Sequence, residues 1–116
     1  MLGWPHMKNE IQVLHEKAIK TAENYLHAES DLIEILQILD DSKAYRELGY
    51  RSLFEYGTQA LKLSENVTYN LITVARKSKE VPQLQSKIRN REISLSNARM
   101  ISPVLTPQNQ DLGRIT

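Results

Sequence analysis

The stretch Leu61–Lys77, LKLSENVTYNLITVARK, decides the fold, because it predicts an amphipathic helix with a defined start. Ser64 is a typical N-cap, since its hydroxyl accepts from a free backbone N–H, and Glu65 places a carboxylate at the positive helix end. At about 100° per residue, the apolar and small side chains fall on one side: Val67, Thr68, Leu71, Ile72, Val74 and Ala75. The opposite side holds Asn66, Tyr69, Asn70, Thr73, Arg76 and Lys77. The helix is therefore expected to bury one side and present the other to solvent.

The polar side of this helix suits a nucleic acid, because it carries no acid and its side chains match base edges and phosphates. Asn pairs with adenine and Arg with guanine, while Thr and Lys contact phosphates. Residues 52–61 predict a shorter helix just before it, and two helices joined by three or four residues form a helix-turn-helix. The second helix would then be the recognition helix. The predicted DNA-binding residues are Arg51, Lys62, Ser64, Asn66, Tyr69, Asn70, Thr73, Arg76 and Lys77. An ordinary surface helix of a bundle gives the same pattern, so this alternative stays open.

Length and composition indicate a single folded domain. The chain has 116 residues, of which 41% are hydrophobic and 25% charged, so a packed core is expected rather than disorder. The absence of cysteine excludes disulfides, thiolate metal sites and cysteine nucleophiles, and fits a reducing compartment. No apolar run approaches the ~18–20 residues that cross a bilayer, and no secretory signal is recognisable. We expect no membrane partner and a cytoplasmic, nucleoid-associated protein.

The charge is unevenly distributed along the chain. Residues 1–62 hold seven Lys or Arg against ten acids, a net −3, whereas residues 63–116 hold eight against four, a net +4. The basic excess begins at the predicted recognition helix. It favours a polyanion such as double-stranded DNA as the partner of the second half.

Residues 1–7 contain Gly, Trp and a His-Met pair, which suggests a tag or a disordered N-terminus with Met7 as the native start. Residues 8–41 form the second unit of the predicted organisation. From Lys8 to Leu48 there is no Gly or Pro. Apolar or small residues recur at the alternating three- and four-residue spacing of a heptad repeat: Ile11, Leu14, Ala18, Thr21, Tyr25, Ala28, Leu32, Ile35 and Leu39. The segment is either one long helix or a helical hairpin broken near Ser30, and the seam needs the rest of the chain or a second copy as its partner. We expect a homodimer through this segment.

Residues 42–116 are expected to form the helix-turn-helix domain as a bundle of short helices. Gly49 ends a helix at 43–48, Pro82 begins one that extends to about residue 90, and Ser94 or Ser96 caps the next. Thr106 and the following proline suggest the start of a last helix. No segment alternates with period two, so the predicted fold class is all-α with no sheet. The predicted core comprises Leu53, Phe54, Tyr56, Leu61, Val67, Leu71, Ile72 and Ala75, closed by Leu84, Ile88 and Ile101.

The sequence lacks the residue patterns of known catalytic and metal sites. His15 and His27 lie twelve residues apart on the long helix, and there is no His-Glu-x-x-His motif, paired cysteine or Gly-rich phosphate loop. We therefore expect no catalytic residue, no metal ligand and no cofactor in this chain.

Several motifs follow one another in an order that resembles a known family. They are Leu48-Gly49-Tyr50-Arg51-Ser52-Leu53-Phe54-Glu55-Tyr56, then Leu63-Ser64, Ala75-Arg76, Pro82, Ile93-Ser94-Leu95-Ser96 and Leu105-Thr106-Pro107-x-Asn109. This order resembles the N-terminal helical region of bacterial HNH-endonuclease-like proteins and covers about residues 30–110. The part from Ser64 to Arg99 is also similar to the helix-turn-helix core of ParB-type partition proteins. The resemblance implies a helical DNA-binding region, whereas the metal-binding HNH module is absent from this sequence, so no nuclease residue is carried over.

The sequence thus predicts a non-catalytic, DNA-binding helix-turn-helix domain from an HNH-nuclease-like or regulatory protein. Two alternatives stay open. One is a protein–protein interaction or dimerisation module that does not bind DNA, and the other is an enzyme fragment whose catalytic module lies beyond Thr116.

Overall fold

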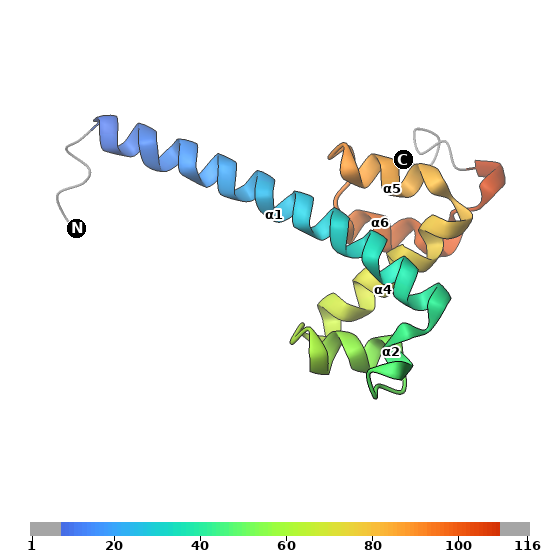
Figure 1. Cartoon of the computed structure of the whole chain (residues 1–116). Coiled ribbons are helices and arrows are strands. Elements are labelled where there is room, and N and C mark those ends of the chain that lie inside the picture. The colour runs from blue at the N-terminus through green and yellow to red at the C-terminus, as the bar shows by residue number, and fades with distance from the viewer. Residues whose placement is uncertain (1–7, 110–116) are drawn as a thin grey trace.

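The computed structural model describes residues 8–109, and every regular element within this range is helical. One long helix, α1 (Lys8–Ser42), is followed by shorter segments that gather around its C-terminal half (Figure 1). These are α2 (Ala44–Glu47), α3 (Leu53–Glu55), the π-helical η2 (Tyr56–Ala60), α4 (Glu65–Glu80), α5 (Pro82–Arg89), α6 (Leu95–Ile101) and the short 3-10 turns η3 (Ser102–Val104) and η4 (Pro107–Asn109). The expected all-α class is confirmed. The motif at residues 1–7 lies outside the described residues.

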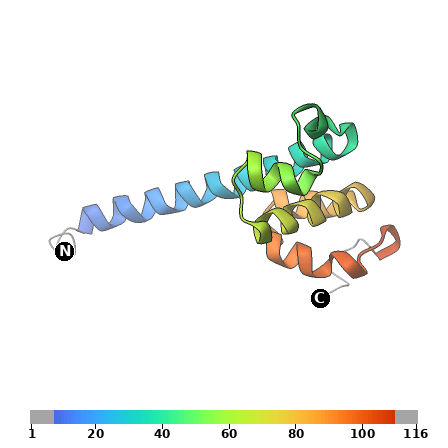
Figure 2. The same cartoon turned by 90° about the horizontal axis from the view of Figure 1, so that it is seen from below.

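α1 is one continuous helix and does not form a hairpin. Ser30 and Asp31, where the alternative hairpin would break, lie inside it, which agrees with the absence of Gly and Pro. It ends at Ser42, and Lys43 adopts a left-handed conformation with φ 57°. About 35 residues at 1.5 Å per residue make a rod of roughly 50 Å, and its N-terminal half extends away from the other helices (Figure 2). The Cα radius of gyration of 17.8 Å is correspondingly larger than the ~13 Å of a compact 100-residue domain.

The short helices begin and end where local signals place them. Ser52, Ser64 and Ser94 each accept a hydrogen bond from a backbone N–H three residues on, at 3.0, 3.1 and 3.1 Å. Pro82 occupies the first turn of α5, and Gly49, with φ 98°, follows α2. The helix expected at 43–48 is shorter than predicted, because the left-handed Lys43 separates it from α1.

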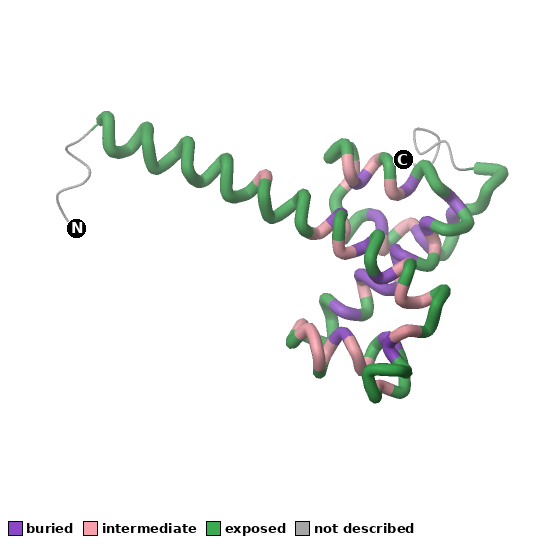
Figure 3. The backbone as a smooth tube through the Cα atoms, in the orientation of Figure 1, coloured by how far each residue is buried: buried purple, intermediate pink, exposed green. Residues whose placement is uncertain are grey.

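The core lies between α4 and the helices around it, and we call this assembly, with residues 30–40 of α1, the bundle. Figure 3 shows buried residues concentrated there, while the free half of α1 is exposed. The buried apolar residues are Ile33, Leu36, Tyr45, Leu53, Leu71, Ile72, Val74, Ala75, Val81, Leu84, Ile88, Ala98 and Leu105. Of the residues predicted from the sequence, Leu53, Leu71, Ile72, Ala75, Leu84 and Ile88 are confirmed as buried, and Tyr56, Leu61 and Ile101 pack at the edge.

Two residues of the predicted core are exposed instead. Phe54 is 39% exposed and Val67 is 40% exposed. Each is next to a fully buried neighbour, Leu53 or Thr68, and the ~100° step between adjacent helical residues turns it away from the core. The predicted core is therefore wrong at these two positions.

α1 packs on the bundle mainly through residues that are not on the heptad row. Ser30, Ile33 and Leu36 are buried against the bundle, whereas Ile35 on the heptad spacing is 51% exposed. Gln37 fixes the same face with two hydrogen bonds, from its Nε2 to the Ala75 carbonyl at 3.1 Å and to Gln85 Oε1 at 3.0 Å. Of the heptad residues in this part of α1, Ile35 lies away from the bundle, whereas Leu32 and Leu39 pack at its edge.

Candidate nucleic-acid interface

α4 is the central helix of the bundle, and its two sides have opposite character. The side that faces the other helices buries Thr68, Leu71, Ile72, Val74, Ala75 and Ser78. Among the predicted polar residues, Asn66, Tyr69 and Arg76 are exposed, whereas Asn70, Thr73 and Lys77 are half-buried. The amphipathic division predicted from the sequence is therefore present in outline: Val67 is exposed on the predicted buried side, and half of the predicted polar side is partly covered.

The segment before α4 is held against it by an unusually close contact. A Cβ built on Gly57 would lie 2.5 Å from Thr68 Cγ2, so only glycine fits without a shift. The helical residues 53–60 and α4 are joined by four residues, Leu61–Ser64, in which Lys62 is left-handed with φ 62°. In η2 the Leu61 N–H donates to the Tyr56 carbonyl at 3.1 Å, five residues back. The close contact between Gly57 and Thr68 fixes the direction of α4 relative to the preceding helix.

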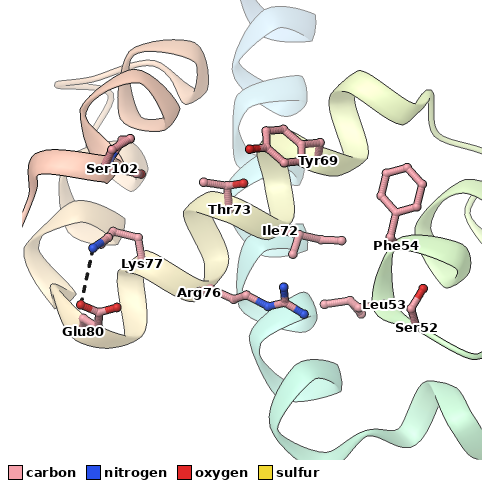
Figure 4. A pocket seen from close by; sticks show the side chains of 11 residues that line it. Ser52, Leu53, Phe54, Tyr69, Ile72, Thr73, Arg76, Lys77, Glu80 and Ser102 are labelled. Carbon is pink, nitrogen blue, oxygen red and sulfur yellow. Dashed lines mark hydrogen bonds and ion pairs between the residues drawn. The ribbon is translucent and has the colours of Figure 1, made fainter.

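A groove of about 480 Å³ runs along the polar side of α4 (Figure 4). Tyr69, Thr73 and Arg76 come from α4 itself, Phe54 from α3, and Pro103 from η3. The exposed Phe54 ring thus forms part of the groove wall. Tyr69 and Thr73 therefore lie in a groove whose walls are both apolar and polar, and not on an isolated ridge.

The cations near the C-terminal end of α4 already have partners. Arg76 donates to both carboxylate oxygens of Asp40, at 3.0 and 3.2 Å, and Lys79 Nζ lies 2.9 Å from Asp40 and 2.8 Å from Asp41. The Arg76 hydrogen bond, with that of Lys79, lowers the pKa of Asp40 to about 2. Lys77 donates to the Leu105 carbonyl at 3.0 Å. A phosphate at this end would compete with these groups.

Two other predicted cations come before α4 in the chain. Lys62 is exposed in the connection just before the helix. The Arg51 side chain lies 3.4 Å from Glu55 Oε2, but it is 91% exposed, and such a surface ion pair contributes little to stability. Ser64, another predicted site residue, has its hydroxyl engaged as the N-cap.

Arg99 is a candidate residue that sequence reasoning missed. It comes from α6, and its guanidinium carbon lies 5.0 Å from the centre of the Tyr69 ring, in the range of a cation–π contact. It brings a positive charge to the exposed polar side of α4 from thirty residues further along the chain. The resemblance to ParB-type proteins had singled out the position for its motif, but no local pattern placed it beside Tyr69.

The described residues contain no group of three or more His, Asp or Glu side chains close enough to hold a metal ion. None of the helices in residues 8–109 is both long and apolar enough to span a membrane. No protein-family model, curated protein or solved structure matches this chain. The resemblance to HNH-endonuclease-like and ParB-type proteins therefore stays a prediction from the motifs.

Proposed function

We propose that this chain is a non-catalytic DNA-binding domain in which residues 53–60 and α4 act as a helix-turn-helix. The observation that carries the proposal is the polar row of α4, whose Asn66, Tyr69, Asn70 and Thr73 side chains lie on the side away from the core. A four-residue connection and a close helix contact are what such a motif needs to hold a recognition helix rigidly.

In this proposal the two ends of α4 have different roles. The N-terminal half meets base edges through its Asn side chains. These side chains are available because they take no part in the hydrogen bonds that engage Arg76 and Lys77 further along the helix. Lys62 and the helix N-terminus contact phosphates, and Arg99 adds a charge beside Tyr69. Arg76 and Lys77 contact phosphates only by weakening their bonds to Asp40 and Leu105.

The test is the affinity for a labelled double-stranded DNA of mixed sequence, measured by fluorescence anisotropy over a range of salt concentrations. A domain that makes phosphate contacts loses affinity linearly in a plot of log K against log salt, with a slope of about −0.9 for each phosphate neutralised. Absence of binding at low salt, or binding that does not change with salt, would refute the proposal. Selection from a random duplex pool then identifies any preferred sequence.

A second candidate function is supported by the free half of α1, where Ile11, Leu14 and Tyr25 are exposed. We propose that the chain self-associates through this helix as a homodimer. If the salt titration shows no DNA binding while the dimer persists, the chain is a dimerisation or protein-interaction module instead.

The context of the domain is proposed on the resemblance alone. It implies that the domain supplies DNA contact to an HNH-nuclease-like or regulatory protein, and hence a nucleoid-associated location. Expression of a longer coding sequence that adds the implied module, followed by a DNA cleavage assay with divalent metal, tests this context. Cleavage by the longer protein and none by residues 1–116 would support it.

A further inference from the structure

Two faces of α1 differ in how far the rest of the chain covers them. The first is the bundle side, where Ser30, Ile33 and Leu36 are buried. The second is the heptad row, which we call the seam: Ile11, Leu14, Ala18, Thr21, Tyr25, Ala28, Leu32, Ile35 and Leu39. Seven of these nine residues are exposed, and Leu32 and Leu39 are half-buried.

The seam is clear of the bundle from Ile11 to Ala28 and is exposed again at Ile35, whereas Leu32 and Leu39 pack at the edge of the core. At about 100° per residue a heptad row drifts by ~20° for each seven residues. Near Ile35 the seam has consequently turned well away from Ile33, which faces α4 and α5. Ile38, beside this part of the seam, is 65% exposed. A partner helix could therefore follow the seam from Ile11 to Ala28 without displacing the bundle, and could reach the exposed Ile35 beside the half-buried Leu32.

Another apolar row on α1 does not offer this continuity. Ile19 and Leu26 are exposed and spaced by seven residues, and the next member of their row is Ile33. Ile33 is completely buried in the bundle. Moreover, Arg91 from beyond α5 donates to the Glu23 carbonyl at 3.3 Å on this side. A long partner helix on this row would collide with the chain's own bundle.

We propose that a second copy of this chain packs along the seam, forming a two-stranded coiled coil over most of α1. A heptad row is self-complementary, because each residue at its a and d positions inserts between those of an identical helix. Ile11 and Leu39 are 28 residues apart, or ~42 Å at 1.5 Å per residue, and the supercoil follows the drift of the row. The inference rests on the proposed homodimer and names its surface, but it does not depend on DNA binding.

The test compares matched substitutions by sedimentation equilibrium of the whole chain, without DNA, at about 50 µM. Leu14 is on the seam and Ile19 is off it, but the two residues are almost equally exposed, at 46% and 47%. The first matched pair is therefore Leu14→Asp and Ile19→Asp. Ile35→Asp and Val13→Asp form a second pair, at 51% and 49%. We expect the unaltered chain and both off-seam variants to show twice the chain mass, and both seam variants to fall to the monomer mass, a two-fold decrease.

Three results would overturn the proposal. They are a monomeric unaltered chain, dissociation by Ile19→Asp as complete as that by Leu14→Asp, and a dimer that persists in Ile35→Asp. Far-UV circular dichroism of each variant separates dissociation from unfolding, since the bundle would keep its helix content. Failure of the DNA titration with a dimer that responds as expected would refute only the DNA-binding proposal.

Discussion

Gly57 and Thr68 lie so close together that a methyl group on the glycine would overlap the Thr68 Cγ2 at 2.5 Å. The contact joins η2 to the first turns of α4, and it sets how near the two helices approach. Because both are buried, neither can move into solvent to relieve the overlap.

Gly57→Ala is therefore expected to destabilise the domain by about 1–3 kcal/mol, the usual cost of inserting a methyl group into a packed site. Chemical denaturation gives the change in free energy of unfolding. Adding Thr68→Ser removes the methyl group that the introduced alanine side chain would strike, and should recover part of the loss. A double variant as unstable as the sum of the single ones would show that the contact is not responsible.

Leu53→Ala and Phe54→Ala make a matched pair, because the residues are adjacent and differ in burial. Leu53 is 1% exposed, so its truncation should cost about 2–5 kcal/mol. Phe54 is 39% exposed on the groove wall, so its truncation should cost clearly less despite the larger side chain. Thermal unfolding measures the Tm of both variants. A larger drop in Tm for Phe54→Ala than for Leu53→Ala would contradict the structure.

Asp40 should make stability depend on pH at acid values. Its folded-state pKa of about 2 lies below the ordinary 3.8, so its contribution is fully present above pH 3.8 and is lost as the pH falls towards 2. Asp40→Asn should lower the free energy of unfolding by about 1–3 kcal/mol at neutral pH. Urea unfolding at pH 7 and pH 2.5 measures both effects. The difference between the two proteins should shrink at the lower pH, and an unchanged difference would exclude Asp40 as its source.

Asn70→Ala and Lys62→Ala should affect DNA binding in different ways. Loss of a base contact by Asn70 should relax the preference at one base pair, at a cost of about 1–3 kcal/mol for the preferred sequence. Loss of a phosphate contact by Lys62 should weaken all sequences alike and lower the salt slope by about 1. Anisotropy titrations with the selected and a scrambled duplex distinguish these results. Equal weakening of both duplexes by Asn70→Ala would remove it from the base-reading residues.

Leu14→Cys should report the direction of the proposed coiled coil, since the chain has no other cysteine. With Ile11 at an a position and Leu14 at a d position, we expect a parallel, in-register pair, which also places both bundles at the same end. Two copies of residue 14 then face each other, and mild oxidation should give a disulfide-linked dimer on a non-reducing gel. Val13→Cys serves as the control. An uncrosslinked dimer would indicate antiparallel helices.

The sequence was a good guide to features that depend on neighbouring residues. Ser64 and Pro82 begin helices because a cap or a missing N–H acts within one turn. The sides of α4 followed from the helical period. Burial of a particular residue was harder to predict, because it depends on which helix covers it: Phe54 was expected in the core and is exposed, whereas Ile33, which is not on the heptad spacing, is buried.

Contacts between distant segments could not be predicted from the sequence. Arg76 and Asp40 are separated by 36 residues, and only the packing of α1 against α4 brings them together. The same holds for Arg99 and Tyr69. The polar side of α4 was therefore predictable, whereas the free or occupied state of its cations was not.

Gln37 has a consequence for the geometry of any assembly. Its amide bonds both the Ala75 carbonyl of α4 and the Gln85 side chain of α5, so α1 cannot rotate about its own axis without breaking a half-buried hydrogen bond. The rotational phase of the long helix is thereby locked to α4. The polar row of α4 would therefore keep one angle, measured around the axis of α1, to a second chain bound along α1. Replacing Gln37 would loosen that angle while leaving the seam and the polar row intact.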